Sequence, residues 1–342
     1  ARMAAGDPPA AVQTSGYDIG EWVERGVLAN LSRQARREHW DKAVPKALQR
    51  FARHDGKWVA APVSVGSTNW IWANAAIFEK LDLAPPTSWD ELVAALGTIR
   101  DAGYVALAHG GQAWQDTVMF EAVVMSVGGP QFYRAAFIDL DPEALGGRRM
   151  VEAFGRMAVL RGFVDEAFTG RDWSLASAMV ADGKAGMQIT GDWAKAQFLD
   201  AGLEPAGDIL CFRFPATQDA VIFTADQLAM FAVARDRRRA QAAFAASLMS
   251  PAVQSAFNAA RGTVPARTDV PDDGFDGCAR KAMRQIAAAD ASGALVGSLA
   301  LGHAAPAPVR DAVLGVVTAH FNGEYDAGRA AEELVKAVAA AQ

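Results

Sequence analysis

No excess of positive charge marks this sequence, in which 33 lysine and arginine residues stand against 39 aspartate and glutamate residues. A formal net charge of −6 gives no basic field that could draw the chain onto phosphate backbones or anionic lipid. No run of about 18 apolar residues occurs either, because glutamine, serine, proline and asparagine interrupt the alanine-rich stretch 240–260. We therefore expect no nucleic-acid partner and no membrane-spanning helix.

Catalytic and cofactor motifs are also missing. The sequence has no GxxxxGK[ST], GxGxxG or HExxH motif and no paired CxxC, and its five histidines are scattered. We therefore expect no metal, no cofactor and no enzymatic activity. The alternative is a glycosidase that uses carboxylates such as Asp139 and Asp141, or Asp272 and Asp273, but acidic pairs of this kind are typical of solvated turns.

Cysteine is sparse as well. The two cysteines are Cys211 and Cys278, and their spacing is equally consistent with two buried thiols and with one disulfide. The residues alone leave both possibilities open.

The chain does contain enough apolar material for two cores. Its 342 residues are 51% hydrophobic, and single cores stop growing at about 250–300 residues. Helical and extended patterns alternate through the first two thirds, and capping residues at 87–91 predict a helix over 89–102. We predict an α/β fold of two lobes. Because no flexible linker separates the lobes, we expect the chain to cross between them more than once.

Three segments combine aromatic rings with amides and carboxylates, namely 69–72, 109–116 and 191–193. This mixture suits sugars, whose C–H faces stack on rings and whose hydroxyls need donors and acceptors. The segment 109–116 is predicted to be a loop before a helix, and such a break also suits a crossing between lobes. Each segment has an alternative interpretation: the tryptophans of 69–72 as core residues, Trp114 as the cover of a helix end, and Asp192 as a helix cap.

Six short segments occur in an order that is familiar from one family. They are NWIWAN (69–74), PTSWDE (86–91), HGGQAWQD (109–116), GRDW (170–173), GDWAK (191–195) and RGTVPARTDV (261–270). In this order they resemble the extracellular solute-binding proteins of bacterial ABC-type sugar importers, especially the glucose-binding branch. The resemblance covers nearly the whole chain.

The resemblance implies a fold of the periplasmic-binding-protein type, with two α/β lobes and a ligand cleft between them. It also implies export to the periplasm, a monomer that closes on its ligand, and a membrane permease that recognises the closed form. By the same resemblance Cys211 and Cys278 would form a disulfide, which suits an oxidising compartment. The lobes are predicted as residues 1–107 with 227–267, and residues 108–226 with 268–342.

Residues and resemblance together predict the side chains that bind the sugar. The rings of Trp70, Trp114 and Trp193 would stack on the ligand. The groups expected to bind hydroxyls are Asn69, Gln115, Asp116, Asp226 and Arg261.

Four positions differ from those usual in the glucose-binding branch. Thr14 and Arg261 stand where lysine is usual, Leu301 stands where histidine is usual, and a further histidine is usual near Ser67. We expect His303 to compensate for Leu301. Because a buried site that loses a polar partner is weakened by roughly 1–3 kcal/mol, the resemblance predicts a mono- or oligosaccharide without naming glucose.

The resemblance also bears on the start of the chain. Members of the family normally begin with a strand, a helix and a second strand before the segment that resembles residues 1–31. We expect the chain to be a fragment of a longer receptor, or its first lobe to be completed by another chain.

The predicted function is the periplasmic substrate-binding component of an ATP-driven sugar importer. The alternative is a truncated or degenerate receptor that acts as an interaction protein without binding sugar. A glycan-cleaving enzyme comes third.

Overall fold

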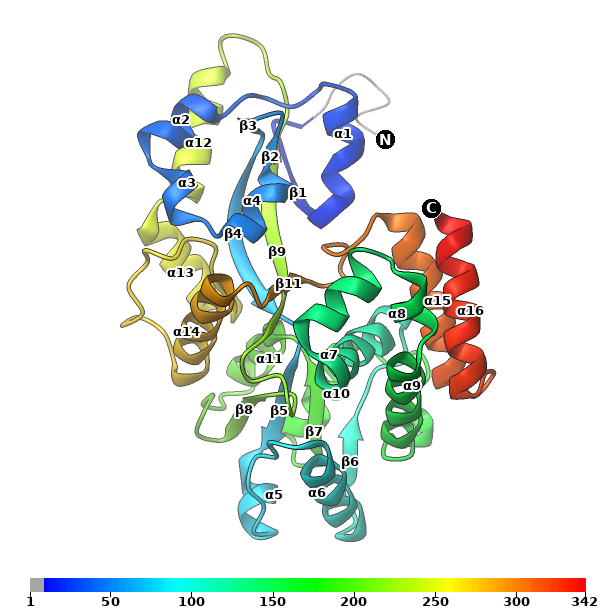
Figure 1. Ribbon diagram of the computed structural model, residues 1–342. Coiled ribbons are helices and arrows are strands. Elements are labelled where there is room, and N and C mark those ends of the chain that lie inside the picture. The colour runs from blue at the N-terminus through cyan, green and yellow to red at the C-terminus, as the bar shows by residue number, and fades with distance from the viewer. Residues whose placement is uncertain (1–8) are drawn as a thin grey trace.

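The computed structural model describes residues 9–342, which form two lobes, one above the other in Figure 1. Each lobe is a β-sheet with helices packed on it. The predicted α/β fold with two lobes is confirmed. Residues 1–8 of the predicted first lobe lie outside the described residues.

The sheet of the first lobe is built around β9, which is rich in Val, Ile, Phe and Thr, residues that favour strands. Strands β1 and β4 run antiparallel to β9, β10 pairs with β4, and β11 runs parallel to the start of β9. The bounds are β1 (Ala11–Ser15), β4 (Ala60–Ser67), β9 (Val221–Met230), β10 (Val264–Pro265) and β11 (Leu295–Gly297).

Short helices and a small hairpin complete the first lobe (Figure 1). The helices α12 and α13 lie along one side of its sheet, and α4 packs on β4, β9 and β11. The bounds are η1 (Gly16–Ile19), α1 (Gly20–Glu24), α2 (Ser32–Arg37), α3 (Trp40–Ala43), α4 (Lys46–Ala52), β2 (Arg53–His54), β3 (Lys57–Trp58), α12 (Arg238–Leu248) and α13 (Pro251–Arg261).

The sheet of the second lobe has the strand order β6-β7-β5-β8. Strand β6 runs parallel to β7, whereas β5 runs antiparallel to both β7 and β8. The bounds are β5 (Trp70–Asn74), β6 (Val105–Ala108), β7 (Ala185–Thr190) and β8 (Ile209–Arg213).

Helices α7, α9, α15 and α16 pack on one another at one side of this lobe (Figure 1). Helix α7 is kinked at Gly129, which has φ 70°, and Pro130 follows. The bounds are α5 (Ala75–Lys80), α6 (Trp89–Asp101), α7 (Ala113–Phe137), α8 (Pro142–Gly146), α9 (Arg148–Arg161), η2 (Glu166–Phe168), α10 (Trp173–Ala181), η3 (Asp192–Ala194), α11 (Lys195–Asp200), α15 (Ala307–Phe321) and α16 (Ala327–Ala341).

The predicted start of α6 is confirmed in detail. The Ser88 hydroxyl accepts from the backbone N–H of Glu91, and the Glu91 carboxylate accepts from the backbone N–H of Ser88, which is a capping box. Over residues 9–342, we find no helix with both the length and the apolar character that a membrane span requires.

The lobe boundaries differ from those predicted. Residues 70–107 lie in the second lobe, as β5, α5, α6 and most of β6, and residues 221–226 belong to β9 of the first lobe. The loop after β6 leads into α7 of the same lobe, so its polar sequence does not mark a crossing. Within the described residues the chain instead crosses at 68–69, 214–220 and 298–306.

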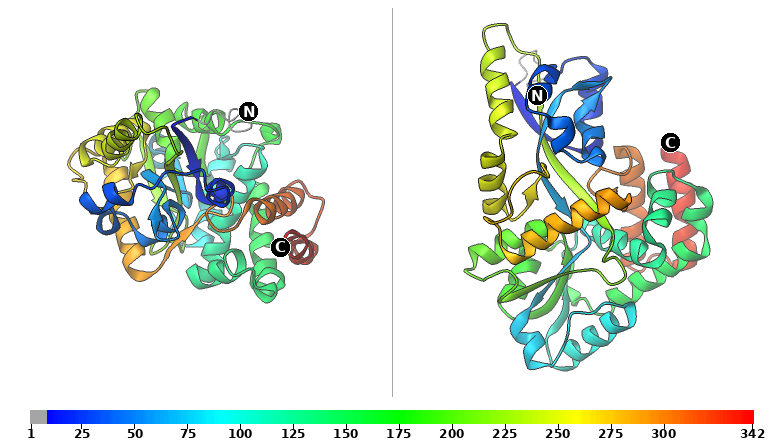
Figure 2. Two further views of the ribbon diagram at one scale, coloured as in Figure 1. Left: turned by 90° about the horizontal axis from the view of Figure 1, so that it is seen from above. Right: turned by 60° about the vertical axis from the view of Figure 1, so that its left-hand side comes forward.

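Helix α14 (Gly277–Ser292) joins the two lobes and runs between their sheets in the right-hand view of Figure 2. It packs on β9, β10 and β11 of the first lobe. It is also tied to β8 of the second lobe, because Cys278 forms a disulfide with Cys211 and Lys281 Nζ donates to the Cys211 carbonyl at 3.1 Å. The disulfide that the resemblance implied is confirmed.

The disulfide predicts a measurable contribution to stability. Because it closes a loop of 67 residues in the unfolded chain, replacing both cysteines by alanine is expected to lower the free energy of unfolding by roughly 3–5 kcal/mol. Urea unfolding with and without reductant measures the difference. Reductant should shift the wild type towards the double variant and leave the variant unchanged. A variant as stable as the oxidised wild type would contradict the prediction.

Candidate functional site

A cleft of about 630 Å³ lies where the two lobes face each other. The first lobe contributes side chains from β1, β4, β9 and the end of α13, and the second contributes the starts of α7 and α10, η3 and α15. Residues of the crossing 298–306 form part of the wall. Segments that are far apart in the sequence therefore meet at this cleft.

The face of the cleft on the first lobe is a polar patch on adjacent strands. Residues two apart on a strand share a face, so Thr224 and Asp226 of β9 both point to the cleft. Their cross-strand partners on β4 are Gly66 and Ser64, and Ser15 of β1 lies opposite Asp226 on the other side. Hydroxyls, a carboxylate and a glycine thus line this face.

Two ion pairs set the charge of the cleft. Arg261, the last residue of α13, places a guanidinium nitrogen 2.7 Å from Asp226 Oδ2, and Ser64 Oγ lies 3.4 Å from the same oxygen. A guanidinium nitrogen of Arg310 lies 3.6 Å from Asp18 Oδ1. Among the described residues that line the cleft, the two acidic and two basic side chains balance each other.

The face on the second lobe carries the rings of Trp114, Trp173 and Trp193. The centroids of the Trp114 and Trp193 rings are 6.1 Å apart. Gly191 makes room for the Trp193 ring, because a Cβ at this position would lie 2.0 Å from it. The Nε1 of Trp114 donates to Gln112 Oε1 at 2.9 Å, which fixes the edge of that ring. Apolar surfaces with fixed orientations therefore face the polar patch of the first lobe.

The structure brings four of the predicted site residues to the cleft: Trp114, Trp193, Asp226 and Arg261. The sequence interpretation missed Trp173, Asp18 and Arg310, which also line it. For Trp173 a signal was present, because Asp172–Trp173 repeats the pair Asp192–Trp193 and each pair directly follows a glycine-containing turn.

Asn69 and Trp70 do not line the cleft. The carboxamide of Asn69 is buried and makes its hydrogen bonds inside the crossing between lobes. The ring of Trp70 is buried between Trp72, at 6.1 Å, and the guanidinium of Arg213, at 4.3 Å. Both side chains belong to the joint between the lobes, which corrects their predicted contact with the ligand.

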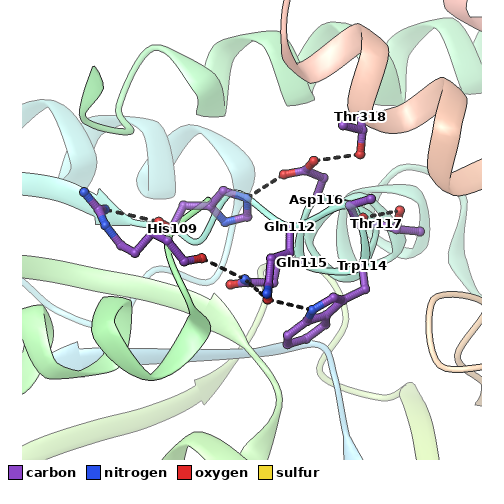
Figure 3. Close-up of polar contacts among 9 residues, drawn as sticks. His109, Gln112, Trp114, Gln115, Asp116, Thr117 and Thr318 are labelled. Carbon is purple, nitrogen blue, oxygen red and sulfur yellow. Dashed lines mark hydrogen bonds and ion pairs between the residues drawn. The ribbon is translucent and has the colours of Figure 1, made fainter. Parts of the chain in front are cut away.

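Gln115 and Asp116 are directed away from the cleft, because α7 already begins at Ala113 where a loop was predicted. Figure 3 shows Asp116 pointing to the side of α7 away from Trp114. Its carboxylate lies 2.9 Å from His109 Nε2 and accepts from the Thr318 hydroxyl at 2.8 Å. Gln115 Nε2 donates to Gln112 Oε1 at 2.9 Å. Asp116 therefore ties α7 to His109 and to α15 within the second lobe, whereas Gln115 shares the acceptor Gln112 Oε1 with Trp114.

His303 lies behind the polar patch. Its ring is buried against Phe51 and Phe223, at centroid distances of 5.1 and 5.4 Å, and Nε2 lies 3.1 Å from the Ala225 nitrogen. Burial lowers the pKa of His303 to about 4, so the ring is neutral at physiological pH. His303 therefore does not take the place of a histidine at Leu301, which itself lines the cleft.

Among residues 9–342, no group of three or more His, Cys, Asp or Glu side chains is placed to ligate an ion. What the cleft offers is apolar rings on one face and hydrogen-bonding groups on the other.

A family model described as bacterial extracellular solute-binding protein matches residues 1–255. The chain belongs to this family. A relative from Rhizobium meliloti, named a probable sugar-binding periplasmic protein, is 53% identical over 342 residues, which cover all of this chain and 82% of the relative. A relative of the same name from Brucella melitensis is 52% identical and covered to 81%. The family resemblance seen in the sequence is confirmed.

Solved structures of solute-binding proteins share the fold. A chitin oligosaccharide binding protein superimposes with a TM-score of 0.79 at 20% identity, over 99% of this chain and 85% of that chain. A maltose-bound protein of T. maritima gives a TM-score of 0.75 at 17% identity, over 100% of this chain and 87% of that chain.

In this solute-binding protein the cleft wall at 298–301 is held by Glu121, which is buried in the middle of α7. Its carboxylate accepts from the Tyr133 hydroxyl at 2.6 Å, the Ser298 hydroxyl at 2.8 Å, and the backbone N–H groups of Leu299 and Ala300. Burial raises the pKa of Glu121 to about 7 although these donors favour the charged form. Glu121 therefore positions Ala300 of the cleft wall directly, and it positions Leu301 through Ser298, whose hydroxyl accepts from the Leu301 N–H at 3.2 Å.

The raised pKa predicts a pH dependence of stability. The folded chain binds the Glu121 proton more tightly than the unfolded chain does, so protonation of Glu121 stabilises the fold. This contribution to the free energy of unfolding is fully present below pH 4.5 and is lost as the pH rises through 7. The difference in unfolding free energy between wild type and Glu121→Gln should change by roughly 3 kcal/mol over this interval. Urea unfolding at a series of pH values measures it.

The exposed Glu143→Gln variant is the control, and its unfolding free energy should follow the wild type at each pH. A constant difference between wild type and Glu121→Gln would contradict the prediction.

Proposed function

We propose that this protein is the periplasmic sugar-binding component of an ATP-driven importer and that it binds an uncharged mono- or oligosaccharide by closure of its lobes. The observation that carries the proposal is the interlobe cleft, in which rings from one lobe face hydroxyls, a carboxylate and a guanidinium from the other. The rings suit the C–H faces of a sugar and the polar groups suit its hydroxyls. The names of the close relatives point the same way.

The balance of charge favours a neutral ligand. The carboxylates of Asp18 and Asp226 are each paired with an arginine, so neither sign is in excess among the described lining residues. At the pair of Asp226 with Arg261, a carboxylate or ammonium on the ligand would have to displace one partner and leave the other without it. Sugar hydroxyls can donate to Asp226 and accept from Arg261 without breaking their pair.

The size of the cleft allows more than one sugar ring. Its volume of about 630 Å³ lies in the middle of the range of roughly 300–1,000 Å³ that is usual for ligand pockets. The cleft carries three tryptophan rings, and two of them, Trp114 and Trp193, are neighbours. Rings placed in this way can stack on successive sugar units.

Capture follows from contacts with both lobes. A ligand that touches both the polar patch and the tryptophan rings binds the closed arrangement of the lobes more tightly than the open one. This difference in affinity shifts the equilibrium between the two arrangements towards the closed one. The closed form is then the one that a membrane permease recognises. The protein acts as a monomer, without cofactor and without turnover. A disulfide-bonded chain suits the oxidising periplasm.

Tryptophan substitutions test the proposal. We expect Trp114→Ala and Trp193→Ala each to raise the Kd of the bound sugar about tenfold or more, because loss of a stacking ring costs about 1.4 kcal/mol or more. Isothermal titration calorimetry against glucose, galactose, xylose, maltose and diacetylchitobiose identifies the sugar and measures its Kd. Analysis of the sugar after incubation should find no product.

The matched control is Trp89→Ala, which removes a ring that packs on Arg156 outside the cleft and should leave the Kd unchanged. If no sugar binds the folded wild type, the interaction-protein alternative is favoured. Release of product would favour the glycan-cleaving alternative.

A further inference from the structure

Asp192 connects the lobes beside the cleft. It lies in the turn that follows β7 of the second lobe, one residue before Trp193. Its Oδ2 accepts from the backbone N–H of Ser67 at 3.0 Å and from the Ser67 hydroxyl at 3.3 Å. Ser67 ends β4 of the first lobe, directly before a crossing between lobes. The predicted role of Asp192 as a cap of the next helix is wrong, because its side chain makes no cap bond there.

The contact continues into the joint between the lobes. Trp70 Nε1 donates to Ser67 Oγ at 2.7 Å, so the hydroxyl that donates to Asp192 is itself oriented by a buried ring. On the other side of the turn, Trp72 Nε1 donates to the carbonyl of Gly191 at 3.1 Å. The turn that presents Trp193 is therefore fixed at Gly191 by its own lobe and at Asp192 by the opposite lobe.

The other carboxylate oxygen of Asp192 is buried against the floor of the cleft. Oδ1 has no hydrogen-bond partner among residues 9–342. A Cβ on Gly66 would lie 2.6 Å from Oδ1, so the glycine is what allows this close approach. Gly66 lines the cleft from the first lobe. A buried carboxylate oxygen without a donor is costly, and it is found where a structural or functional requirement maintains it.

We propose that Asp192 is a positioning residue of the ligand cleft: its bonds to Ser67 form when the lobes come together and hold Trp193 in the orientation that contacts the ligand. This inference rests on the proposed function, since it concerns how that same cleft closes on its sugar. Asp192 does not line the cleft itself, and it acts through Trp193 on one side and Ser67 on the other.

The charged groups around Asp192 come from three other elements. Lys195 of α11 and Arg213 of β8 both favour the charged carboxylate, but burial outweighs them and raises the pKa of Asp192 to about 7. Lys195 is itself paired with Asp276, which caps α14, at 2.7 Å, and Lys281 of α14 lies over the Trp70 ring. Gly66 and Ser67 of β4 and Thr224 of β9, which touch the carboxylate or its surroundings, do not titrate.

A pH dependence of ligand affinity follows. When the lobes separate, water reaches the carboxylate and its pKa falls towards the ordinary value, so the arrangement with the lobes together binds the proton more tightly. Ligand binding should then take up protons, and the Kd should fall as the pH is lowered from 8 to 6. One proton can account for a change of at most about tenfold per pH unit.

The test is calorimetry of Asp192→Asn with the panel sugar that binds the wild type best, at pH values from 5.5 to 8.5. We expect the wild-type Kd to fall several-fold as the pH is lowered and the Kd of the variant to be independent of pH. Ser67→Ala keeps the carboxylate and the backbone donor but loses the hydroxyl, so its Kd should be raised about threefold or more while its pH dependence remains. Loss of packing alone would not produce this pattern.

Asp172→Asn is the matched control, because Asp172 precedes the cleft ring Trp173 as Asp192 precedes Trp193. Within residues 9–342, however, its carboxylate bonds only to Ser174 of its own helix. The Kd of this variant should change with pH as the wild-type Kd does. A wild type that binds sugar with the same Kd at every pH, or a Ser67→Ala variant with wild-type affinity, overturns this inference and leaves the proposed function in place. A folded wild type that binds no sugar overturns both.

Discussion

The carboxamide of Asn69 holds together the place where the chain passes between its lobes. Its Nδ2 donates to the Thr217 hydroxyl at 2.9 Å and the Ala220 carbonyl at 3.1 Å, and its Oδ1 accepts from the Ile222 N–H at 3.1 Å and from Arg213 at 3.0 Å. In a buried position an unpaired amide would be costly, and here both of its polar atoms are bonded. One side chain thereby ties the crossing before β5 to the crossing before β9.

The placement of the two faces of the cleft depends on this joint. The strands β4 and β9 leave it to form the polar patch, and β5 and β8 leave it to form the sheet that carries the tryptophan-bearing turns. The guanidinium of Arg213 extends the joint by stacking on Trp70 while it bonds to Asn69. The two faces of the cleft can therefore move relative to each other only by changes in the crossing segments and in the contacts that bridge them, such as Asp192 with Ser67.

Much of the fold could be predicted from local sequence. The capping box at Ser88 and Glu91 fixes a helix start by residues three apart, and two α/β lobes follow from length and from the alternation of patterns. The lobe boundaries could not be predicted in the same way. A loop within a lobe and a crossing between lobes have the same polar composition, and the pairing of β6 with β7 distinguishes them only in three dimensions.

The site was predicted in part for a related reason. Successive residues of a helix point about 100° apart, so once α7 begins at Ala113 the side chains of Trp114 and Asp116 must point in nearly opposite directions. Only one of them can face the cleft. Similarly, Asn69 has the chemistry of a sugar-binding amide, but its burial depends on Thr217 and Ala220, which lie 148 and 151 residues further along the chain.

The two Asp–Trp pairs show how far a local pattern determines a role. Asp172 caps α10 through Ser174, and these bonds lower its pKa. Asp192 reaches Ser67, 125 residues away, and burial raises its pKa. In both pairs the following tryptophan enters the cleft, so the local sequence determines where the ring goes. Whether the carboxylate stabilises one helix or joins two lobes is determined by the opposite strand, where Gly66 leaves the space that Asp192 fills.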